Sequence, residues 1–186
     1  MDESGLLPLL RISPNKSCGM VLDSRATSPQ HTEMFHFLGK LIGMAVRTNN
    51  VLTIKLAPLI WKMLVEQDVE AEDLMEVNPG LRGAFEFLKE PQTVLEQAAV
   101  LLPDEAICFT ADASLLTTFT SEPAELRAGG RELLVTEANL SEYLEDLEGF
   151  VWREVHELTP MVAAVRKGIC DIIPSLALRL LTGTTT

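Results

Sequence analysis

The spacing of hydrophobic and polar residues predicts a mostly helical chain with a few short strands. The first strong helical pattern follows Ser28, which can cap a helix, and Pro29, which suits the first helical position. Its apolar residues fill about half of a helical wheel, a width that predicts burial in a core. They are Met34, Phe35, Phe37, Leu38, Leu41, Ile42, Ala45 and Val46.

Two glycines lie on the other side of this helix, together with His36, Lys40 and Arg47. Gly39 and Gly43 each cost roughly 0.8–1 kcal/mol relative to alanine inside a helix. Because they are four residues apart they share one side, where a second backbone can approach closely. We expect such an approach, and glycines merely tolerated on the surface are the alternative.

Similar patterns predict the other helices, and several of them begin at a cap or a proline. They are expected at residues 58–65, 71–75, 81–89, 93–100, 136–158 and 160–173. In the third of these, Leu81, Phe85 and Leu88 share one side. Thr136 is expected to begin the longest helix, and Pro160 to interrupt it and start another.

Three segments in the middle of the chain are typical of short strands, namely residues 106–109, 115–120 and 132–135. Gly129 and Gly130 supply a turn before the last of them. The predicted fold class is therefore α+β and predominantly helical, with a small strand-containing subdomain between two helical halves. The expected divisions are an irregular lead-in with one short strand at most (1–30), a first helical part (30–70), the small subdomain (71–136) and the long helix with the end of the domain (137–186).

The charge of the chain narrows the classes of partner. Its 186 residues include 27 Asp and Glu against 15 Lys and Arg, a formal net charge of −12. Binding to nucleic acid or to an anionic membrane surface is disfavoured, because both need clustered cations. No stretch approaches the ~20 apolar residues of a membrane span, and Asp2 and Glu3 rule out the basic start of a secretory signal. We expect a cytoplasmic or nuclear setting.

General chemistry identifies no active site in the sequence. The three cysteines are too far apart for a metal or redox motif and are interpreted as structural; they are Cys18, Cys108 and Cys170. The three histidines lack a Cys or Asp at ligand spacing, so we expect no zinc site. The many acidic residues are interpreted as a solvated face. We therefore predict no catalytic residue, no metal and no cofactor in this chain.

Six motifs, in the same order along the chain, resemble the N-lobe of HECT ubiquitin ligases. One is the glycine-containing helix at residues 35–46, and another is Ile-Cys-Phe-Thr at residues 107–110, which is similar to a strand of that family. The others lie at residues 72–79, 125–130, 135–143 and 162–174. The resemblance covers about residues 30–182, and it is closest to the large HERC-type ligases at residues 47–49 and 162–168.

This resemblance implies a HECT N-lobe fold in which residues 71–136 form the small E2-binding subdomain. In that family ubiquitin passes from an E2 enzyme to a ligase cysteine, and then to a substrate lysine. The ligase cysteine lies in a Thr-Cys-Phe context in a C-terminal lobe, which none of the three cysteines here matches. We expect that lobe and the opening helices of the N-lobe to be absent, and the chain alone to be inactive.

Carried over by motif, the apolar residues that grip the E2 are Leu81, Phe85, Ile107, Tyr143 and Leu147. Leu81 with Phe85, and Tyr143 with Leu147, are i, i+4 pairs that can each present one patch. Phe85 and Tyr143 are favoured, because aromatic residues dominate interface hot spots. The alternative is that all five are core residues, which is equally good for Ile107 and Leu147.

The expected partners are a ubiquitin-conjugating E2 enzyme, ubiquitin indirectly, and a protein substrate of the full-length parent. The other interpretation of the chain is a non-enzymatic helical interaction module. Such a module would be a truncated paralogue that sequesters an E2 or binds another protein.

Overall fold

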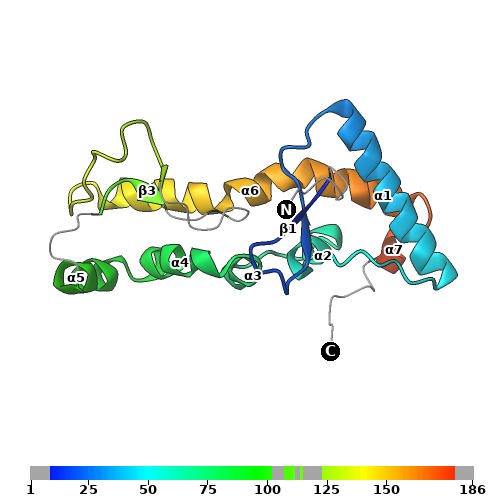
Figure 1. Ribbon diagram of the computed structural model, residues 1–186, viewed down its shortest axis with the longest axis horizontal. Coiled ribbons are helices and arrows are strands. Elements are labelled where there is room, and N and C mark those ends of the chain that lie inside the picture. The colour runs from blue at the N-terminus through cyan, green and yellow to red at the C-terminus, as the bar shows by residue number, and fades with distance from the viewer. Residues whose placement is uncertain (1–8, 102–106, 112–113, 115–122, 179–186) are drawn as a thin grey trace. The chain divides into compact units, whose positions relative to one another are not determined.

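The computed structural model describes residues 9–101, 107–111, 114 and 123–178, and Figure 1 labels most of their helices and strands. Contacts between residues divide the chain into two compact units. The first unit comprises residues 1–77 and 155–186, and the second comprises residues 78–154. The predicted division into four ranges stays a prediction.

The first unit begins with an antiparallel hairpin of β1 (Leu10–Ile12) and β2 (Met20–Leu22), in which Leu10 lies opposite Leu22. The lead-in therefore holds two strands where one at most was expected. The helices of this unit are α1 (Pro29–Thr48), α2 (Pro58–Leu64), α3 (Ala71–Val77), the last part of α6 (Leu140–Cys170) and α7 (Ser175–Leu178).

The second unit consists of short helices, a small sheet and the start of α6. Its helical elements are the 3₁₀ turn η1 (Pro79–Leu81), α4 (Arg82–Lys89), α5 (Pro91–Leu101) and residues 140–154 of α6. Its sheet pairs β3 (Thr110–Ala111) with β4 (Ala124–Glu125) in antiparallel register. Of the predicted strands, residues 107–109 and 132–135 meet through one bridge between Cys108 and Leu134. Residues 115–120 lie outside the described part of the chain.

The start of α1 is as predicted. The Ser28 hydroxyl accepts a hydrogen bond from the backbone N–H of His31 at 3.2 Å, and Pro29 occupies the first helical position. The helix ends at Asn49, whose φ of +52° is left-handed and whose N–H returns to the carbonyls of Ala45 and Val46. This is a common way to satisfy the last carbonyls of a helix.

The face of α1 that is buried differs from the expected one. Phe35, Leu38 and Ile42 are buried as predicted, but Phe37 is 59% exposed. Met34 and Val46 are exposed as well, so the prediction of a half-circumference core face is wrong for these three residues. The glycine side is buried in their place, because it packs against the backbone of α6.

The glycine prediction is confirmed. A Cβ atom on Gly39 would lie 1.9 Å from the carbonyl oxygen of Val165, and one on Gly43 would lie 3.1 Å from that of Ile169. Gly168 on α6 completes the contact, since its Cβ would lie 2.0 Å from the carbonyl oxygen of His36. α1 and α6 therefore cross at backbone contact within the first unit (Figure 1).

Helix α6 differs from its prediction at its start and in its middle. It begins at Leu140, because the side chain of Asn139 accepts the N–H of Thr136 at 2.7 Å and holds residues 136–139 as a turn. It also runs through Pro160 without a restart. Proline removes one helical hydrogen bond, but buried Leu158 and Met161 on either side keep this segment packed. Burial of such side chains, at about 1.5–3 kcal/mol each, offsets that loss.

Each unit has its own core. In the first unit the fully buried side chains include Val21, Leu22, Ile60, Leu64, Leu74, Val165 and Ile169. α2 and α3 are joined by a 2.7 Å ion pair between Lys62 and buried Asp73, whose second oxygen accepts the N–H of Glu70. Among the helices described, none is long and apolar enough to span a bilayer.

Candidate functional site

The second unit is organised around Tyr143 on α6. Its ring meets Phe87 of α4 at 5.2 Å between centroids and Phe109 at 5.3 Å, both in edge-to-face geometry. Such pairs contribute about 0.5–1.5 kcal/mol beyond the area they bury. All three rings are buried, so this cluster is the core that supports the surrounding surface.

Arg127 fastens the segment after β4 to α6. Its guanidinium carbon lies 4.6 Å from the centroid of the Phe109 ring. Its Nε donates to Asp146 at 2.5 Å, and its Nη1 donates to Glu142 at 2.7 Å. Hydrogen bonds to Asp146 first and Glu142 second raise the pKa of Arg127, so the side chain stays charged.

Residues 130–135 lie alongside residues 107–109. The N–H of Phe109 donates to the carbonyls of Gly130 and Leu133, each at 3.0 Å, and the N–H of Val135 donates to Ile107 at 2.8 Å. Gly130 is required here, because a Cβ atom would lie 2.3 Å from the carbonyl oxygen of Phe109. The backbone contacts therefore fix the position of the two residues between Glu132 and Val135.

Those two residues, Leu133 and Leu134, present apolar side chains to solvent. They are 38% and 50% exposed, and neighbouring Ile107 is half-buried. Exposed apolar residues held on a fixed backbone are typical of a protein-docking surface rather than of a core. We call Ile107, Leu133 and Leu134 the leucine edge.

The leucine edge belongs to the most acidic part of the protein. The second unit carries 15 of the 27 acidic residues and only 5 of the 15 Lys and Arg, a net charge of −10 out of −12. Glu132 and Glu137 flank the edge in sequence, and both are exposed. α6 adds a row of exposed carboxylates at Glu142, Glu145 and Glu148. The second unit is therefore suited to a partner with a basic face.

The structure separates the five predicted contact residues into two groups. Leu81, Tyr143 and Leu147 are buried, and Phe85 and Ile107 are half-buried. Phe85 meets Trp152 of α6 edge-on at 6.3 Å. The predicted shared side of Leu81, Phe85 and Leu88 does not form the buried face of α4, where Phe87 is buried in place of Phe85 and Leu88.

Sequence reasoning missed Phe87, Leu133 and Leu134. The 3₁₀ turn at residues 79–81 has three residues per turn, so the phase of an α-helix cannot be carried from Leu81 into α4. The two leucines did carry a signal. Side chains of successive residues in extended chain point to opposite sides, so consecutive apolar residues place at least one outward on a one-sided sheet.

The structure also shows the state of the three cysteines and of the residue types that bind metals. Cys18, Cys108 and Cys170 are free thiols. Burial, and to a lesser extent Glu76, raises the pKa of buried Cys18, which makes it a poor nucleophile. Within the described residues, no group of three or more His, Cys, Asp or Glu side chains is arranged to hold a metal ion.

Comparison with known proteins gives the family. The sequence matches the HECT-domain (ubiquitin-transferase) family over residues 5–185. The chain belongs to the HECT-domain family. This confirms the resemblance read from the motifs, and the mostly helical α+β fold is the HECT N-lobe-like fold that the motifs predict.

Its relatives are much longer proteins. The chain is 28% identical over 190 residues to human E3 ubiquitin-protein ligase HERC2, which covers 97% of this chain and 4% of HERC2. It is 29% identical to the human probable E3 ubiquitin-protein ligase HECTD4, over 95% of this chain and 5% of that protein. To mouse NEDD4, an E3 ubiquitin-protein ligase, it is 25% identical over 89% of this chain and 16% of NEDD4. The chain thus corresponds to one part of a HECT ligase.

Proposed function

We propose that this chain is the E2-docking portion of a HECT ubiquitin-protein ligase. The observation that carries the proposal is the leucine edge, in which two exposed leucines beside half-buried Ile107 are held on a fixed backbone within a unit of net charge −10. Burying exposed apolar side chains against a partner contributes favourably to binding, by roughly 25 cal/mol per Å² of apolar area. The surrounding carboxylates increase the rate of encounter with a basic partner surface.

In this proposal the five residues predicted by motif act in two ways. Ile107, together with Leu133 and Leu134, contacts the E2 directly, and half-buried Phe85 is a second contact point on α4. Tyr143, Leu147 and Leu81 are buried, so in this proposal they support the docking surface from the core and do not contact the E2. Tyr143 holds Phe109, whose backbone in turn holds residues 130–133.

We further propose that the chain docks the E2 but forms no ubiquitin thioester itself. Cys18 is buried with a raised pKa, and Cys108 and Cys170 are half-buried. Incubation with E1, E2 and ubiquitin, followed by a non-reducing gel, tests this point. A ubiquitin adduct on the chain that disappears with reductant would overturn it.

The docking surface is tested by titrating the ¹⁵N-labelled chain with a panel of E2 enzymes. We expect the signals of residues 107 and 132–135 to shift first. Leu134→Ser should weaken binding by about tenfold or more, because hot-spot residues contribute upward of ~1.4 kcal/mol each. Leu176→Ser is the matched control, since Leu176 is 73% exposed but lies in the first unit.

The same titration separates the proposal from its rival. A non-enzymatic module that binds another protein would leave these signals unmoved by every E2. If an E2 bound and Leu134→Ser and Leu176→Ser had equal effects, the leucine edge would not be the docking surface.

A further inference from the structure

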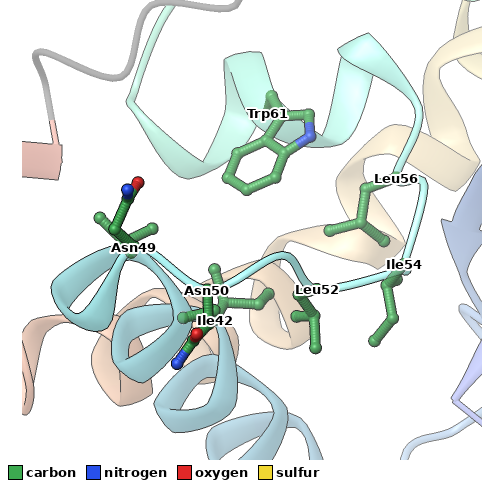
Figure 2. Close-up of a pocket in the computed structure, with 9 residues that line it drawn as sticks. Ile42, Asn49, Asn50, Leu52, Ile54, Leu56 and Trp61 are labelled. Atoms are coloured by element: carbon green, nitrogen blue, oxygen red, sulfur yellow. The ribbon is translucent and has the colours of Figure 1, made fainter.

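The first unit contains a pocket that plays no part in the proposed docking of an E2. Its volume is about 330 Å³, and it lies between the end of α1, the segment that follows it and α2 (Figure 2). Its walls are mostly apolar, and its polar groups include two amides at the end of α1. The lining residues are Ile42, Ala45, Val46, Asn49, Asn50, Leu52, Ile54, Leu56 and Trp61.

The pocket offers an apolar contact through Trp61 and a polar contact through the amide of Asn49. Figure 2 shows the indole of Trp61 on α2 and the side chain of Leu56 pointing toward the space beside the end of α1. Asn49 ends α1 in the left-handed conformation, and its side-chain amide makes no hydrogen bond within the described part of the chain. Asn50 donates to the Thr48 hydroxyl at 2.8 Å, which leaves its carbonyl oxygen available as an acceptor.

The chain around this pocket has an unusual charge. Residues 34–65 contain no Asp or Glu, in a protein that has 27 of them, and carry four cations. The four are Lys40, Arg47, Lys55 and Lys62. The pocket is therefore built from a basic segment of an acidic protein.

One of these cations, Arg47, is available to a partner. Lys40 and Lys62 are engaged by Asp171 and Asp73. Arg47, in the last turn of α1, has no ion pair among the described residues, and Lys55 donates only to the Ser17 carbonyl, at 2.5 Å. Opposite charge on a partner would therefore be attracted to this region.

We propose that this pocket binds an acidic peptide segment of another protein through one large apolar side chain. A cavity of about 330 Å³ is at the lower end of the range for small-ligand sites and has room for a leucine or phenylalanine side chain. The amide of Asn49 can hydrogen-bond the peptide backbone beside that side chain. Arg47 favours carboxylates on the flanking positions, and residues 34–65 carry no Asp or Glu to repel them, which commits the site to an acidic partner.

The surface beside the pocket fits a peptide rather than a small free ligand. Val51 is 92% exposed, and Val46 and Leu52 are also exposed. Val46 and Leu52 line the cavity itself, and Val51 neighbours Leu52 in the sequence, so a bound segment would cover apolar surface that is otherwise left in water. Covering this apolar surface contributes favourably to binding.

The test uses the whole chain labelled with ¹⁵N and a synthetic six-residue peptide, Glu-Asp-Leu-Glu-Asp-Glu, blocked at both ends. The two tryptophans give separate indole signals, so Trp61 reports the pocket and Trp152 serves as an internal reference in the second unit. We expect the Trp61 signal to shift on titration while that of Trp152 stays constant. A peptide with alanine in place of leucine should bind about tenfold more weakly or worse.

Three variants distinguish the proposed contacts. Arg47→Glu should weaken peptide binding by about threefold to fivefold at low salt, while Lys16→Glu, at an exposed site outside the pocket, should not. Asn49→Gly keeps the left-handed turn and removes the amide, so it should weaken binding by about twofold to tenfold.

Other results would overturn the proposal. The proposal would fail if the indole signal of Trp61 did not shift at millimolar peptide. It would also fail if a peptide with lysine in place of its acidic residues bound equally well. A shift of Trp61 on concentrating the chain alone would mean that a second copy occupies the pocket. None of these outcomes affects the leucine edge, because that surface lies in the other unit.

Discussion

Gly39 of α1 and Gly168 of α6 lie against each other without space for a side chain. A Cβ atom on either glycine would lie 3.0 Å from the Cα atom of the other. The nearest atoms are carbonyl oxygens of the backbone, which cannot move aside as the end of a flexible side chain can. The crossing therefore depends on glycine at both positions.

We expect Gly39→Ala to destabilise the protein even though alanine is the better helix former. Alanine gains about 1 kcal/mol of helix propensity, but overpacking against fixed backbone costs about 1–3 kcal/mol or more. Because a Cβ atom would lie only 1.9 Å from the carbonyl oxygen of Val165, we expect a cost at the upper end of this range. Urea unfolding measures the net loss.

Gly149→Ala is the matched control, because nothing lies within 4 Å of a Cβ atom at that position of α6. We expect it to raise the free energy of unfolding by up to about 1 kcal/mol. Equal effects of the two substitutions would show that the crossing tolerates a wider separation.

The two sides of α1 show what the sequence could and could not predict. The spacing of Gly39 and Gly43 correctly indicated a close backbone contact, because two costly residues on one side need a common reason. Hydrophobic periodicity predicts which residues share one side of a helix. It does not predict which other element packs against that side. The exposure of Phe37 could therefore not be derived, since it depends on where α6 crosses.

Phe37 should contribute to self-association more than to stability. It is 59% exposed, and exposed Met34 and Met44 lie three and seven residues away, so they form one apolar stripe on α1. Phe37→Ser is expected to change the free energy of unfolding by less than about 0.5 kcal/mol. Sedimentation at rising protein concentration should show less association than in the unmodified chain.

Phe35→Ala provides the contrast, because Phe35 is fully buried on the other side of the same helix. Its expected loss is about 3–5 kcal/mol. If Phe37→Ser cost as much as Phe35→Ala, the stripe would belong to the core.

Asp171 is expected to make stability depend on pH. A 2.7 Å hydrogen bond from His36 is the main cause of the lowered pKa of this carboxyl, and Lys40 at 3.5 Å also favours its charged form. A pKa that is lower in the folded state gives stabilisation that is present above the unfolded value, about 3.9. That stabilisation is lost as pH falls through the folded pKa.

Asp171→Asn should therefore reduce stability near neutral pH and have a shrinking effect as pH falls below about 4. Thermal unfolding followed from pH 7 to pH 2.5 measures the difference between the two proteins. Asp68→Asn is the control, because exposed Asp68 has no ion pair or hydrogen bond among the described residues. A pH-independent difference for Asp171→Asn would contradict this account.

For the candidate site, the sequence indicates a region of the chain more than it indicates individual residues. Family motifs directed attention to residues 71–136 and to Tyr143 and Leu147 on the long helix, and the strongly acidic composition of residues 78–154 follows from the sequence. The burial of Tyr143 does not follow, because it depends on Phe109, 34 positions earlier, and on Phe87, 56 positions earlier. The role of Arg127 was missed for the same reason, since its partners lie 15 and 19 residues away on another element.

Arg127→Lys is expected to loosen the segment that carries the leucine edge. Lysine keeps the charge, but it cannot donate to Asp146 and Glu142 while lying flat on Phe109, because it lacks the planar guanidinium. The N–H of Leu126, which donates to Phe109 at 2.9 Å, should then exchange with solvent several-fold faster. E2 binding should weaken in parallel, although Arg127 itself is not proposed to touch the E2.

The control for this change is Arg82→Lys, because Arg82 is exposed on α4 and has no ion pair among the described residues. It should alter neither the exchange of Leu126 nor E2 binding. Faster exchange without weaker binding would mean that residues 130–135 are held by the Phe109 backbone contacts alone. In that case the link from α6 through Arg127 to the leucine edge would not exist.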